Sequence, residues 1–152
     1  MKKEKAIDAL NSLVTINNDR IEGYETASKE TEEPDLKTLF AQFISTSQKC
    51  RQELVREVTA LGGEVAEGTK TSGKFFRAWM DFKVALSGKD RKAILNSCEF
   101  GEEKAKDTYD DALENDSEHL TGDHRNMIIN QKAMLKGDRD HIKSLLDALG
   151  DH

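Results

Sequence analysis

The chain has 152 residues, of which 36% are hydrophobic and 34% are charged, and its formal net charge is −6. Abundant charge with a single proline is typical of amphipathic helices, and the length suits one domain. Acidic and basic residues are interleaved without a basic cluster, so we expect no nucleic-acid partner. The sequence has no apolar stretch of about 18 residues, so we expect no membrane-spanning helix.

The two cysteines, Cys50 and Cys98, are too few for a disulfide framework, and both fall on apolar stripes. We expect buried thiols in a reducing cytoplasm. The opening segment MKKEKAIDALNSL has neither the apolar core nor the cleavage site of a signal peptide, and it favours the start of a helix.

Residues 5–30 and 35–61 carry apolar residues at alternating spacings of three and four, which predicts two long helices with one buried face each. Pro34 suits the first turn of the second helix, where its missing N–H group costs no hydrogen bond. Gly62 and Gly63 are expected to end that helix, because glycine readily adopts the left-handed conformation of a C-cap.

Residues 63–73 are small and polar and favour a loop, and residues 74–87 favour a short helix. The stretch FFRAWMDF holds four of the nine aromatic residues of the chain. Two interpretations fit it. Trp79 and its neighbours form a lid across the bundle, with Arg77 reaching solvent or a carboxylate, or the same segment is an adaptor surface for a partner helix.

Residues 89–114 and 122–149 predict two further long helices, joined by a short polar connection. Helices of this length are each about 40 Å long, and the long connection between the second and third can traverse the whole bundle. The predicted fold is therefore all-α: one domain over residues 1–152, a four-helix bundle with the single long crossover of ferritin-like proteins.

Polar residues stand on stripes that should be apolar. Asp138 and His141 are spaced i, i+3 on the last helix, and Glu102 lies on the stripe of the helix before it. Buried acids and histidines are unfavourable unless paired or bound to metal. Ferritin-like metal sites use a Glu from each of two helices and Glu-x-x-His from each of the other two. The candidate metal ligands are Glu25, Glu99, Glu102, Asp138 and His141.

The second helix breaks this pattern, because it has Ser47-x-x-Cys50 and no histidine. A full di-iron site is therefore not encoded, although a half-site would suit one Zn²⁺, Mn²⁺ or Fe²⁺ ion. The alternative is a polar core layer without metal, in which Tyr24, Tyr109 and Gln131 supply hydrogen bonds to the carboxylates. Both interpretations stay open. The sequence contains no G-x-S-x-G, P-loop or H-E-x-x-H motif, which favours a protein that is not an enzyme.

Several motifs resemble one bacterial family. They are IEGYE in the first helix, SGKFFRAWMDFKVALSG in the connection, CEFGEEKAKDTYDDAL in the third helix, and the spacing from Gln131 to His141. The family comprises uncharacterised ferritin-like four-helix-bundle proteins, and R-x-W-M and G-E-x-x-A-x-x-x-Y are its more specific motifs. The resemblance implies a cytoplasmic bundle with no established activity. It favours His141 over Asp138 as the characteristic residue, and it maps onto Gly23, Tyr24, Arg77, Trp79, Glu99, Gly101, Glu102, Tyr109, Gln131 and His141.

The leading expectation is a non-enzymatic bundle with a role in stress or metal physiology, either monomeric or a homodimer. Its inward polar layer would be structural or would bind a small ligand. The first alternative is a metalloprotein with ferroxidase or peroxide chemistry at the five candidate ligands, and the second is an adaptor that uses residues 75–86.

Overall fold

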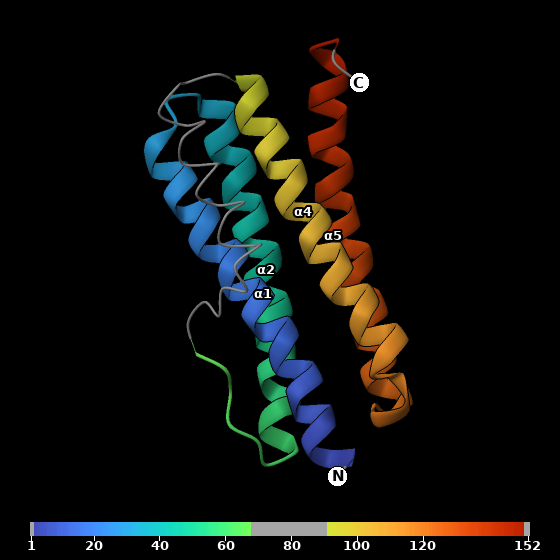
Figure 1. The fold of residues 1–152 in the computed structure, drawn as a ribbon. Coiled ribbons are helices and arrows are strands. Elements are labelled where there is room, and N and C mark those ends of the chain that lie inside the picture. The colour runs from blue at the N-terminus through green and yellow to red at the C-terminus, as the bar shows by residue number, and fades with distance from the viewer. Residues whose placement is uncertain (1, 68–90, 151–152) are drawn as a thin grey trace.

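The computed structural model describes residues 2–67 and 91–150, which are dominated by four long α-helices (Figure 1). The helices are α1 (Lys2–Glu30), α2 (Pro34–Ala60), α4 (Arg91–Asn115) and α5 (Gly122–Ala148), and a 3₁₀ turn, η1 (Ser117–His119), precedes α5. The described ranges contain no strand. The predicted all-α four-helix bundle is therefore confirmed. The expected short helix over 74–87, with Arg77 and Trp79, lies outside the described residues.

The helices form two antiparallel hairpins, α1 with α2 and α4 with α5, and each helix packs mainly on its hairpin partner. The hairpins meet through α1 against α4 and α2 against α5. Figure 1 shows that α2 ends where α1 begins, whereas α4 begins at the opposite end of the bundle. Residues 61–90 therefore join opposite ends, and every pair of neighbouring helices runs antiparallel.

Helix ends follow from local sequence. Pro34 occupies the first turn of α2 as expected. At the other end of this helix, Gly62 has a φ of 78°, and the amides of Gly62 and Gly63 donate to the carbonyls of Thr59 and Val58. These two hydrogen bonds form a Schellman motif, which requires a left-handed backbone conformation at Gly62.

The buried residues form two apolar clusters, one toward each end of the bundle. One contains Leu10, Leu13, Leu54 and Ile128, and the other contains Phe40, Phe43, Leu95 and Ile142. On each helix, buried polar residues lie between these two sets in the sequence: Asn17, Asp19 and Arg20 on α1, Ser47 on α2, Glu102 on α4 and Asp138 on α5. Gln131 is buried earlier on α5, among residues of the first cluster. The core is therefore a polar layer between two apolar ones.

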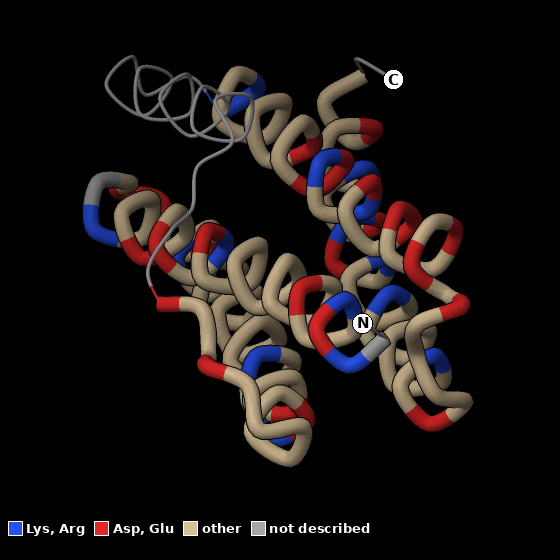
Figure 2. Tube along the Cα trace, turned by 60° about the horizontal axis from the view of Figure 1, so that its bottom comes forward, with Lys and Arg blue, Asp and Glu red and all other residues tan. Residues whose placement is uncertain are grey.

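Charged residues of both signs are interspersed on every helix (Figure 2). None of the helices in the described ranges combines the length and apolarity that a membrane span requires.

Candidate functional site

The polar layer is centred on Arg20, which projects from α1 and is fully buried. Its Nε donates to Glu102 Oε1 at 2.9 Å, and its Nη2 donates to Glu102 Oε2 at 2.6 Å. This bidentate arrangement matches the planar guanidinium to the carboxylate and is among the stronger hydrogen-bonding geometries in proteins. Arg20 on α1 is thus fixed to α4.

The same guanidinium reaches the other two helices. Its Nη2 also donates to Asp138 Oδ2 on α5, at 3.1 Å, and its Nη1 donates to Ser47 Oγ on α2. One side chain therefore connects all four long helices of the described structure.

Aromatic rings enclose this cluster on one side. Tyr24 donates its hydroxyl to Glu102 Oε2 at 3.0 Å. The guanidinium carbon of Arg20 lies 5.6 Å from the Tyr24 ring centre and 5.9 Å from that of Phe43. Both rings are near enough for a cation–π attraction, and they help to exclude water from the ion pair.

The surroundings of the cluster shift the pKa values of its ionisable groups. Burial alone would lower the pKa of Arg20, but the Glu102 carboxylate and its hydrogen bonds raise it above its ordinary value, so the guanidinium stays charged. Burial raises the pKa of Asp138, and Arg20 opposes that shift. The cluster is therefore a pair of acids held around one permanent cation.

A second buried chain of hydrogen bonds lies beside the first. Asn17 donates to the Tyr109 hydroxyl at 2.8 Å, and Tyr109 donates to Gln131 Oε1 at 2.7 Å. The Gln131 amide donates in turn to the Cys50 carbonyl at 3.1 Å and to Glu53 Oε1 at 3.0 Å. This chain also crosses all four long helices, and it uses neutral groups except at Glu53.

The two thiols offer no evident nucleophile. Cys50 and Cys98 are free and buried, as expected. Burial raises the pKa of Cys50 to about 12 and that of Cys98 well above its ordinary value. Because the thiolate is the reactive form of cysteine, both side chains are inert at neutral pH.

The five candidate metal ligands separate into two groups. Glu102 and Asp138 are buried and converge on Arg20, whereas Glu99 is half-buried and Glu25 and His141 are exposed. His141 was expected to point inward with Asp138, and that orientation is wrong. The buried stripe of α5 continues from Asp138 to Ile142, four residues on, so an apolar side chain takes the inward position and His141 turns outward.

The donor set therefore does not fit a metal centre. Within the described residues, no group of three or more His, Cys, Asp and Glu side chains could hold a metal ion. The two buried carboxylates already have a cation between them, and Arg20 uses oxygen atoms of both.

Sequence reasoning missed several buried polar residues, among them Arg20 and His124. Arg20 lies three residues after Asn17 and four before Tyr24, so it shares their face of the helix, but it was not among the candidate residues. The sequence contained a signal for Arg20, because acids that point inward on two helices are unfavourable unless a cation pairs with them. His124 is also buried and was not among the candidate residues. It completes a capping box with Thr121, and its Nε2 lies 3.2 Å from Glu57 Oε1.

Comparison with known families matches residues 5–115 to a family described as a domain of unknown function (DUF2383). The chain belongs to this family. The match includes the helices that supply Arg20, Ser47 and Glu102, and it ends before α5, which supplies Gln131 and Asp138. No curated protein matches the chain.

Proposed function

We propose that this protein is a non-enzymatic, ferritin-like bundle in which Arg20 takes the central place that metal ions hold in metal-binding bundles. The order and directions of the helices support the ferritin-like assignment. The observation that carries the proposal is the bidentate contact of Arg20 with Glu102, together with its bond to Asp138. The cation that neutralises the inward acids is supplied by the chain itself.

The proposed role of the polar layer is to fix how the two hairpins dock. Each hairpin has extensive contacts within itself and fewer with the other. Apolar contacts tolerate sliding of one hairpin on the other, whereas a guanidinium bound to three partners does not. Buried polar groups specify register in some helical assemblies, and this arrangement suits that role. The protein is then a scaffold whose two hairpins are held in one register by the Arg20 cluster.

We place this scaffold in the cytoplasm of a bacterium. The two free, buried cysteines and the family resemblance support that location.

Metal analysis of protein purified without a histidine tag tests the proposal. We expect no stoichiometric metal, and no change in melting temperature on adding Fe²⁺, Mn²⁺ or Zn²⁺, because the carboxylates are committed to Arg20. The matched variant is His141→Ala, which alters an exposed side chain and should leave folding unchanged. Stoichiometric metal in the natural protein that is lost in His141→Ala would restore the metalloprotein hypothesis.

A further inference from the structure

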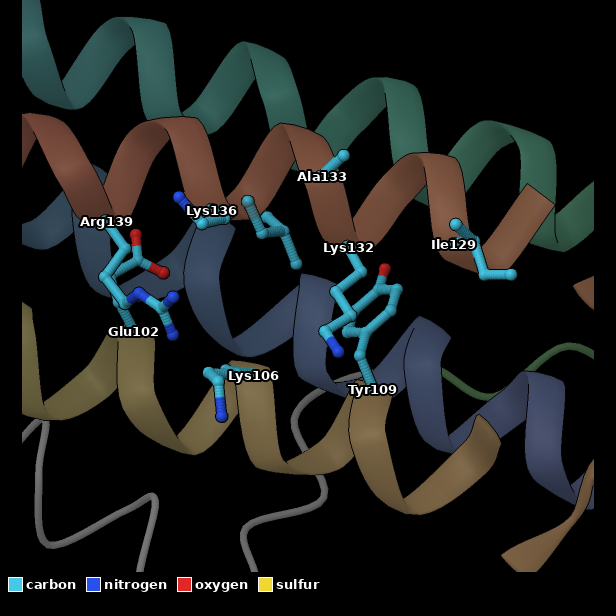
Figure 3. A pocket seen from close by; sticks show the side chains of 9 residues that line it. Glu102, Lys106, Tyr109, Ile129, Lys132, Ala133, Lys136 and Arg139 are labelled. Atoms are coloured by element: carbon cyan, nitrogen blue, oxygen red, sulfur yellow. The ribbon is translucent and has the colours of Figure 1, made fainter. Parts of the chain in front are cut away.

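A groove of about 230 Å³ runs between α4 and α5 on the side of the bundle (Figure 3). Its apolar surface comes from Ile129, Ala133 and Leu135 of α5 and from the ring of Tyr109 on α4. Ile129 is 51% exposed, more than any other large hydrophobic side chain in the described residues. Ile129 and Ala133 therefore offer apolar surface to solvent beside a charged rim, whereas Leu135 and Tyr109 are buried beneath it.

Four cations line the groove: Lys106, Lys132, Lys136 and Arg139. Glu102 is the one acid among the described lining residues, and its carboxylate is already bound by Arg20. The charge of the lining is therefore strongly positive, in a chain whose net charge is −6.

The acids around the groove do not balance these cations. Asp110 is shared by Lys106 and Lys132, so one carboxylate serves two ammonium groups. Glu103 is likewise shared by Arg139, at 3.6 Å, and Lys143, at 3.9 Å. Lys136 has its own partner, because its Nζ lies 2.7 Å from Asp140 Oδ2. The two shared acids each leave about one positive charge uncompensated, which favours an anion in the groove.

Arg139 has an unused donor. Its side chain is 11% exposed, and its Nε is buried without a hydrogen-bond partner among the described residues. Figure 3 shows Arg139 and Lys132 extending from α5 toward α4. A buried donor without a partner is unfavourable, and a ligand oxygen in the groove would satisfy it once the Arg139 side chain turns toward the ligand. The guanidinium edge that includes Nε is also a geometry that binds carboxylates bidentately.

We propose that this groove binds a small aliphatic carboxylate. The carboxylate lies on Arg139, with Lys132 nearby, and the hydrocarbon chain lies along Ile129, Ala133 and Leu135. Pockets for drug-sized ligands usually measure about 300–1,000 Å³, so this smaller groove suits an acid of medium chain length. The inference does not depend on the proposed function, because no residue of the groove except Glu102 takes part in the Arg20 cluster.

Calorimetric titration of the full chain tests the site, with octanoate as the probe. 1-Octanol has the same hydrocarbon chain without the charge, and octylammonium has the opposite charge. We expect octanoate to bind at one site at least tenfold more tightly than either control. In ¹⁵N-labelled protein, the amide shifts that respond should cluster on α4 and α5 around the groove.

Two variants assign the contacts. Arg139→Gln should weaken octanoate binding at least tenfold, and Ala133→Phe should block the groove. Lys143→Gln is the matched control, because Lys143 shares Glu103 with Arg139 but does not line the groove. Octanoate binding that is undetectable at millimolar concentration, equal to that of 1-octanol, or unchanged in Arg139→Gln would overturn the proposal. Tighter binding of inorganic phosphate than of octanoate would overturn the choice of a carboxylate.

Discussion

At the scale of single residues, Arg20 carries the strongest energetic prediction. Removing one partner of a buried ion pair leaves the other unpaired in the core and typically destabilises a protein by about 3–5 kcal/mol. We expect a loss of this size in the free energy of unfolding for Arg20→Met and, separately, for Glu102→Gln. The double variant should lose clearly less than the sum, because neither charge of the pair then remains. Urea denaturation followed by circular dichroism measures all three.

Arg91 supplies the matched control for this cycle. Its two terminal nitrogens also donate to one carboxylate, that of Asp35, but the Arg91 side chain is 28% exposed. Exposed pairs contribute about 0–1 kcal/mol, so Arg91→Met should be nearly neutral. If Arg20→Met were no more destabilising than Arg91→Met, the central role of Arg20 would be wrong.

Asp19, the neighbour of Arg20 in sequence, predicts a pH dependence. Its side chain is buried, Oδ1 has no partner among the described residues, and burial together with Glu22 raises its pKa from 3.8 to about 7. The folded protein therefore holds a proton that the unfolded chain has released, and this contribution to stability is lost as pH rises from about 4 through 7. Asp19→Asn should be more stable than the natural protein at pH 8, with the difference shrinking toward pH 4. Urea midpoints across that range measure it, and a difference that grows as pH falls would contradict the expectation.

At the scale of elements, two glycines should respond oppositely to alanine. Gly62 has a φ of 78°, in the left-handed region, where an L side chain is unfavourable by about 1–2 kcal/mol. Gly137 lies in the middle of α5, is exposed, and has nothing within 4 Å of an added Cβ. Gly62→Ala should lower the urea midpoint, and Gly137→Ala should raise the free energy of unfolding by up to about 1 kcal/mol. A neutral Gly62→Ala would show that α2 does not need this cap.

The same elements show what the sequence could predict. Helix periodicity is a local property, and Pro34 and Gly62 act through their own backbone angles, so the long helices and their ends were predictable. The orientation of His141 was not, because i, i+3 spacing places two residues on similar faces without deciding which is central. Ile142 resolves that ambiguity in the structure. The partners of Glu102 depend on how four helices meet, which no local pattern contains.

At the scale of the whole molecule, the connection between hairpins explains why the fold could be inferred while the site could not. A long segment between the second and third helices implies that it joins opposite ends of the bundle, and the directions of the described helices agree. Which residues share one layer then depends on the relative height of the hairpins. A shift of one turn would place Arg20 against different side chains.

The Arg20 layer also has a consequence for the order of folding. Each hairpin has a short connection, so α1 can find α2, and α4 can find α5, through local contacts that form quickly. Docking the hairpins then requires water to leave a guanidinium and two carboxylates, and the loss of hydration is repaid only when all three are in place. Partly docked states are therefore unfavourable, and the union of the hairpins is expected to be the late, all-or-none step that produces the native bundle.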